Sequence, residues 1–106
     1  MKIDLFYFDG CPSWQTALEN LNTALALEGL DIAVNLIIIN SDQEASEFKF
    51  LGSPSIQIDG KDMWPEQSSS FYMNCRVYKT PKGLRGWPTV DMFRLQLKTM
   101  PKDQLN

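Results

Sequence analysis

Two kinds of hydrophobic pattern open the chain. Residues 3–8 form a short, mainly apolar and aromatic run that ends at Asp9-Gly10 and lacks helical spacing, which is typical of a strand buried on both faces. Pro12 suits the first position of a helix and Gly29 suits its left-handed end. Between them, apolar residues recur at helical spacing at Trp14, Ala17, Leu18, Leu21, Ala24 and Leu25. We predict a strand over residues 3–8 and a helix over residues 12–28.

The next segments repeat this alternation of strand and helix. Residues 31–40 are dense in β-branched residues between polar ones, as expected of a central strand parallel to the first. Ser41 and Glu44 form a capping-box signature, which predicts a short helix over residues 42–50 before Gly52. Residues 55–59 alternate between apolar and polar positions and end at the turn dipeptide Asp59-Gly60. We therefore predict a third strand that leaves Pro54.

The second half of the chain is less periodic. Residues 61–74 include Met63, Trp64, Phe71 and three consecutive serines, and they predict a loop insertion between the third strand and a fourth, antiparallel strand over residues 75–79. The loop aromatics either pack at the domain edge or in a homodimer contact, or form a lid. Pro81, Gly83 and Gly86 indicate a turn region. Thr89 can cap a last helix that carries Val90, Phe93, Leu97 and Met100 at helical spacing, before a frayed tail after Pro101.

Length and composition restrict the class of protein. A chain of 106 residues with 43% hydrophobic and 22% charged residues predicts a single globular domain over residues 1–106. The net charge is −3 and the ten Lys and Arg are scattered, so nucleic acid is not an expected partner. Asp4 and Asp9 interrupt the segment that would have to be a signal peptide, and no apolar stretch approaches the roughly 20 residues of a membrane span. We expect a cytoplasmic protein that does not enter the membrane.

The candidate chemistry is that of thiols. Cys11 and Cys75 are too few for a disulfide scaffold, and with no histidine they cannot complete a four-ligand zinc site alone. The absence of histidine also excludes Ser-His and Cys-His hydrolase mechanisms. We expect no metal and no bound cofactor, with glutathione as an alternative co-substrate.

Four motifs carry a resemblance to a known family. They are Tyr7-Phe8-Asp9-Gly10-Cys11-Pro12, Phe50-Leu51-Gly52-Ser53-Pro54-Ser55, Asp59-Gly60 and Cys75-Arg76-Val77-Tyr78. Together with the order of elements, they resemble the thioredoxin-like superfamily, and within it a group of short bacterial proteins of which some are labelled alkylmercury lyase by similarity. The resemblance implies a thioredoxin-like fold of the α/β class, with three layers (α/β/α) and a central four-stranded mixed sheet. It also implies a cis peptide bond before Pro54 and a position of Pro54 beside Cys11.

Cys11 and Pro54 are the site residues that we predict first. A thiol at the N-terminus of a helix meets unpaired N–H groups and the positive end of the helix dipole, which favour the thiolate. The motif Cys11-Pro12-Ser13-Trp14 departs from the dithiol pattern, because Trp14 stands where a resolving cysteine would be. Leu5 replaces the acid that many thioredoxins place six residues before the nucleophile.

The remaining site residues are accessory candidates. Asp9 could exchange a proton with Cys11 or could simply belong to a turn. Ser53 adjoins Pro54, and Trp14 and Trp87 are expected in the core or at its rim. We expect Cys75, at the start of the fourth strand, to lie on the order of 15 Å from Cys11 and to behave as a small buried hydrophobe.

Three functions fit these residues. The first is monothiol disulfide exchange, in which Cys11 reacts with a thiol or disulfide partner that binds in extended form along the backbone beside Pro54. The second is binding of a soft metal or an organomercurial by Cys11, assisted by Cys75 and Asp9. The third is a non-catalytic interaction module. A short distance between Cys11 and Cys75 would favour a dithiol or metal site over a single reactive thiol or an inert one.

Overall fold

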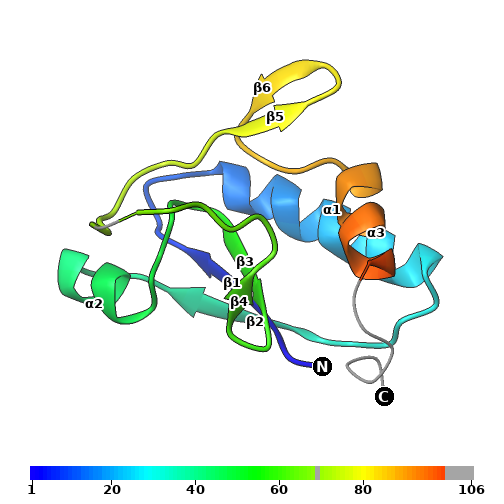
Figure 1. Cartoon of the computed structure of the whole chain (residues 1–106), viewed down its shortest axis with the longest axis horizontal. Helices are drawn as coiled ribbons and strands as arrows, with labels where there is room; N and C mark the ends of the chain where they lie inside the picture. Colours follow the sequence, from blue (N-terminus) through cyan, green and yellow to red (C-terminus); the bar gives the residue numbers. More distant parts are fainter. Residues whose placement is uncertain (69, 100–106) are drawn as a thin grey trace.

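A four-stranded mixed sheet forms the centre of the computed structural model, which describes residues 1–68 and 70–99. The strands are ordered β2-β1-β3-β4, with β1 at Ile3–Tyr7, β2 at Val34–Ile38, β3 at Ser55–Ile58 and β4 at Lys61–Asp62 (Figure 1). The three helices are α1 at Ser13–Leu27, α2 at Asp42–Glu47 and α3 at Val90–Lys98. A separate hairpin consists of β5 at Tyr78–Thr80 and β6 at Gly83–Arg85. The chain is thus of the mixed α/β class.

Local sequence signals determine where the helices begin. The hydroxyl of Ser41 accepts a hydrogen bond from the N–H of Glu44 at 3.1 Å, which confirms the predicted cap of α2. The hydroxyl of Thr89 likewise accepts from the N–H of Met92 at 3.1 Å and caps α3. Helix α1 starts one residue later than predicted, with Pro12 as its N-cap.

The register of the sheet places β1 in its interior. β1 runs parallel to β2, with Ile3 opposite Val34, and antiparallel to β3, with Ile3 opposite Ile58. The predicted parallel pairing of the first two strands is confirmed. The prediction that residues 31–40 form a central strand is wrong, because β2 is an edge strand in which two of the five residues are exposed and the other three only partly buried. A run of β-branched residues fits an edge strand as well as a central one.

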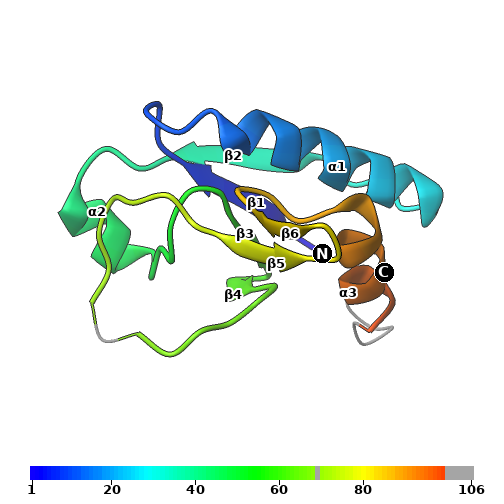
Figure 2. The ribbon, with the colours of Figure 1, turned by 90° about the horizontal axis from the view of Figure 1, so that it is seen from above.

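Apolar side chains cover both faces of the sheet. Ile3 and Leu5 of β1 pack with α1 and α3 in one buried cluster, whereas Phe6 points to the other face and packs with Ala45 of α2 and with Phe50. Figures 1 and 2 both place α3 beside the C-terminal half of α1. Helices therefore flank the sheet on opposite sides. No helix in the described part of the chain is long and apolar enough to cross a membrane.

The fourth strand differs from the prediction. Asp59 and Gly60 both have positive φ angles, of 51° and 85°, and form a tight turn that brings β4 back along β3 immediately. Residues 75–79 are not a strand of this sheet, since Tyr78–Thr80 pairs with Gly83–Arg85 instead. A turn this local closes at a lower entropy cost than pairing across the intervening loop. Met100 and the tail after Pro101 lie outside the described residues.

Residues of the predicted loop insertion pack against the domain. Met63 is 8% exposed, and Trp64 contacts the ring of Phe93 edge to face with centroids 5.4 Å apart. Phe71 packs against the cluster around Phe6. Packing at the domain edge, one of the alternatives that the sequence left open, is thus observed for these residues.

Candidate functional site

Cys11 lies between the end of β1 and the start of α1, in the interior of the protein. Its side chain is 2% exposed, and its backbone N–H donates to the carbonyl of Phe8 at 3.2 Å. Its thiol lies 3.5 Å from the carbonyl oxygen of Ser53, the residue joined to Pro54 by a cis peptide bond. The implied cis bond and the implied proximity of this loop to Cys11 are both confirmed.

Cys75 lies directly against Cys11, which corrects the prediction of a wide separation. The Cys75 Sγ is 3.1 Å from the Cys11 Sγ, and neither is part of a disulfide. Cys75 is also exposed, so the expectation of a buried strand cysteine is wrong as well. The prediction failed because it placed Cys75 at the start of a fourth sheet strand, whereas residues 71–77 run outside the sheet.

Ser53 fixes the position of Cys75. The N–H of Ser53 donates to the carbonyl of Asn74 at 2.8 Å, and the N–H of Arg76 donates to the carbonyl of Ser53 at 3.0 Å, forming a single parallel bridge between Ser53 and Cys75. The hydroxyl of Ser53 accepts from the N–H of Phe8 at 3.4 Å. Ser53 is fully buried, and its backbone groups, which we expected to bind a partner, serve the chain itself.

Arg76 anchors the segment that carries Cys75. Its guanidinium is 4% exposed and lies 2.9 Å from the carboxylate of Asp62, whose side chain is 8% exposed. It also donates to the carbonyl of Trp64 and to the hydroxyl of Ser55, and it stacks 4.8 Å above the centre of the Tyr78 ring. A buried arginine held by hydrogen bonds to Asp62, Trp64 and Ser55 has few alternative positions, so the backbone on either side of it is held in place.

Alternating burial turns Cys75 outward. Arg76 and Tyr78 are 5% and 4% exposed, whereas Val77 is 60% exposed. In an extended segment successive side chains point to opposite sides, so Cys75 and Val77 face solvent while Arg76 and Tyr78 face the core. Sequence analysis missed Arg76 because a charged residue between apolar ones is expected to face outward. In this segment the charged residue Arg76 shares its side with the aromatic Tyr78, and the aliphatic Val77 lies on the other side. That alternation is the signal that could have identified Arg76 as buried.

Gly52 allows the segment to approach the loop before Pro54. Its φ is +118°, and a Cβ atom there would lie 2.9 Å from the Cβ of Arg76. Only glycine tolerates both the backbone conformation and the close approach. The phenol of Tyr78 adds a hydrogen bond to the carbonyl of Pro54 at 2.5 Å. The segment is therefore fixed on this loop at several points.

The hydrogen bond between the thiols affects the pKa of Cys75. The S–H of Cys75 donates to Cys11, and this bond raises the pKa of Cys75, with smaller contributions from burial and from the charge of Cys11.

Burial raises the pKa of the Asp62 carboxyl, and the hydrogen bond and charge of Arg76 oppose that effect. Burial likewise raises the pKa of Tyr78.

The other predicted residues surround the pair without joining it. Asp9 and Pro12 are exposed, and no hydrogen bond or ion pair joins the Asp9 carboxylate to another described residue. Ser13 contacts Gly86, since a Cβ atom at Gly86 would collide with the Ser13 side chain. Trp14 stacks on Tyr7 with ring centroids 4.2 Å apart. Trp14 and Trp87 both pack against the core, as predicted.

No metal centre forms around the thiols. Within residues 1–68 and 70–99, no three His, Cys, Asp or Glu side chains gather closely enough to hold a metal ion.

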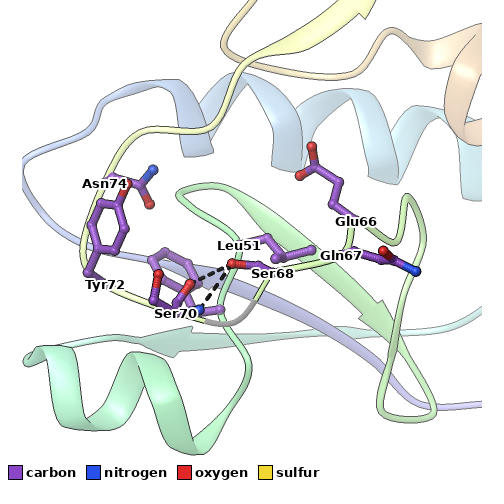
Figure 3. A pocket seen from close by; sticks show the side chains of 8 residues that line it. Leu51, Glu66, Gln67, Ser68, Ser70, Tyr72 and Asn74 are labelled. Atoms are coloured by element: carbon purple, nitrogen blue, oxygen red, sulfur yellow. Dashed lines mark hydrogen bonds between the residues drawn. The ribbon is translucent and has the colours of Figure 1, made fainter.

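A pocket of about 190 Å³ opens beside Asn74, the neighbour of Cys75 (Figure 3). Its described lining residues are Phe50, Leu51, Glu66, Gln67, Ser68, Ser70, Tyr72 and Asn74. Neither cysteine is among them, so the pocket adjoins the thiol pair without containing it.

Comparisons with models of protein families, with curated proteins and with solved structures found no match to this chain.

Proposed function

We propose that this chain has a thioredoxin-like fold and that Cys11 and Cys75 act as a pair in thiol–disulfide exchange. The fold is supported by the strand order β2-β1-β3-β4, by the parallel pairing of β1 with β2, and by the cis bond before Pro54 beside a thiol at a helix N-terminus. The exchange is supported above all by the 3.1 Å between the two Sγ atoms. Small relative movements are enough to bring two sulfurs at this separation to bonding distance.

The reaction transfers two electrons and two protons from two partner thiols to Cys11 and Cys75. In the oxidised chain a partner thiolate attacks Cys75 Sγ, the Cys11–Cys75 bond breaks, and its electron pair leaves on Cys11 Sγ. A second partner thiolate then attacks the partner sulfur of the mixed disulfide and releases Cys75 as a thiolate. The partner leaves as a disulfide, and the two protons lost from its thiols reappear on Cys11 and Cys75. Run in reverse, the same steps reduce a partner disulfide.

The two sulfurs differ in exposure, and this difference assigns them different roles. Cys75 is exposed and meets the partner, whereas Cys11 is buried and out of its reach. Cys11 lies just before α1 and is the sulfur on which the electron pair leaves. Cys75 thereby supplies the second thiol that Trp14 cannot provide. When the reduced chain reduces a partner disulfide, Cys11 resolves the mixed disulfide on Cys75, and that direction needs no external thiol.

Binding of a soft metal or an organomercurial is the weaker candidate. Two thiolates attract soft cations. However, no hydrogen bond joins Asp9 to either thiol, and no third ligand joins the thiols among the described residues. That alternative therefore depends on the two sulfurs alone.

Oxidation by glutathione disulfide tests the proposal, followed by mass spectrometry. The wild type should lose two hydrogens and carry an internal disulfide. Cys11→Ser should instead accumulate glutathione on Cys75, because no second thiol resolves it, and Cys75→Ser should react slowly, because Cys11 is buried.

A matched control moves the exposed thiol without removing it. In the double variant Cys75→Ser/Val77→Cys, a thiol lies at the exposed position 77, on the same side of the segment but farther along it. It should take up glutathione and form no internal disulfide. Thiols that stay reduced in the folded wild type, or glutathione that persists on Cys75 with Cys11 free, would refute exchange by the pair.

A further inference from the structure

The stretch of sequence that carries Cys75 has a charge opposite to that of the whole chain. The net charge is −3, yet none of the thirteen acidic residues lies between Gln67 and Val90. The same stretch holds Lys79, Lys82 and Arg85, all exposed, and none of the three forms an ion pair with a described residue. Exposed positive charges without an ion-pair partner therefore follow Cys75 along the chain.

These charges lie on the β5–β6 hairpin. Figure 1 shows this hairpin, in yellow, standing away from the four-stranded sheet. Its base is nevertheless fixed beside the thiols, since Tyr78 bonds to the carbonyl of Pro54 and Gly86 packs on Ser13, two residues after Cys11. The hairpin thus projects from the rim of the reactive site.

The same surface offers apolar contacts. Val77 and Leu84 are 60% and 63% exposed. A groove of about 490 Å³ at the base of the hairpin is lined mainly by apolar and aromatic residues, with Lys79, Arg76 and the acidic Glu66 also on its wall. Glu66 lies 3.4 Å from the guanidinium of Arg76, so its charge is paired. Because Cys75, Val77 and Lys79 alternate with buried residues, a chain laid along this segment would meet the thiol, an apolar side chain and a cation in turn.

We propose that the β5–β6 hairpin and the groove at its base bind an acidic segment of the protein partner whose thiol or disulfide reacts with Cys75. This proposal rests on the exchange function proposed above and names the class of partner. Exposed cations on the segment that continues from the reacting sulfur attract carboxylates, and Val77 and Leu84 provide the apolar contacts of a protein interface. Three cations are fewer than the about 6–10 phosphate contacts typical of proteins that bind DNA, which favours a protein.

Three synthetic peptides of equal length test this inference. Each carries one cysteine, flanked by glutamates, by serines or by lysines, and each is reacted with the oxidised chain at about 0.1 M ionic strength, where the Debye length is about 10 Å. We expect the glutamate peptide to form the mixed disulfide about tenfold faster than the lysine peptide, with the advantage lost in high salt.

Two charge variants locate the effect. Lys79→Gln/Lys82→Gln/Arg85→Gln should abolish the preference. Lys2→Gln/Lys61→Gln/Lys98→Gln removes the same charge from exposed positions elsewhere and should preserve it. Equal rates for all three peptides, or an unchanged preference in the hairpin variant, would overturn the docking proposal while leaving exchange intact.

The remaining outcomes are equally decisive. If none of the peptides forms a mixed disulfide, the exchange function fails, and the docking proposal fails with it. If a short single-stranded DNA competes for the hairpin better than a cysteine-free glutamate peptide, the partner is a nucleic acid and the proposal is wrong.

Discussion

Replacing Arg76 should destabilise the protein far more than replacing a similar arginine at the surface. In Arg76→Met the carboxylate of Asp62, 8% exposed, loses a partner at 2.9 Å. Breaking a buried ion pair from one side costs about 3–5 kcal/mol, because the remaining charge stays in a poorly solvated site. With a urea m-value of about 2 kcal/mol/M, the midpoint of unfolding should fall by roughly 2 M.

The pair of Arg94 and Glu28 provides the matched control. Their side chains meet at 2.8 Å but are 34% and 14% exposed, and Lys98 lies 3.8 Å from the same carboxylate. In Arg94→Met, Lys98 and water can still solvate Glu28, so the loss should be about 1 kcal/mol or less.

Urea unfolding followed by tryptophan fluorescence measures both losses. Removing both charges of the buried pair, in Arg76→Met/Asp62→Leu, should recover much of the stability that Arg76→Met loses. Equal losses at Arg76 and Arg94, or a double variant no more stable than Arg76→Met, would show that the uncompensated charge of Asp62 is not the cause.

Two further predictions concern the thiol pair and the loop beside it. The hydrogen bond to Cys11 raises the pKa of Cys75, so less Cys75 thiolate is present at a given pH. Cys11→Ala should therefore shift the pH profile of Cys75 alkylation by iodoacetamide to lower pH. An unchanged profile would contradict this bond. Gly52→Ala should cost about 3 kcal/mol in urea unfolding, because strain at a φ of +118° adds to a clash with Arg76. Gly29→Ala, at a φ of +69° with no atom within 4 Å of the added Cβ, should cost only about 1 kcal/mol, and equal losses would refute the clash.

The parts of the fold that sequence analysis predicted are those specified by local signals. The Ser41 and Thr89 caps place two helices, and the turn at Asp59-Gly60 ends β3 where expected. Hydrophobic spacing located α1 to within one residue at each end. Each of these signals acts within a few residues, so no knowledge of distant contacts is needed to interpret it.

The position of Cys75 could not be predicted in this way. It depends on the bridge between Ser53 and Cys75 and on the pairing of Arg76 with Asp62, contacts between residues far apart in the chain. Residues 61–74 also lack a helical or strand period that would indicate their course. Alternation alone cannot tell which side of an extended segment is buried, and here the charged side faces the core.

The separation of the two sulfurs along the chain links their redox state to folding. Cys11 and Cys75 are 64 positions apart. Closing a loop of that length would restrict the unfolded chain by about 4 kcal/mol at 25 °C, against about 2 kcal/mol for a Cys-x-x-Cys pair. By the thermodynamic cycle that joins oxidation and folding, the folded chain should favour the disulfide by that same amount over the unfolded one. A partner that reduces the pair would thereby also lower the free energy of unfolding. The oxidised protein would be the form more resistant to heat and denaturant.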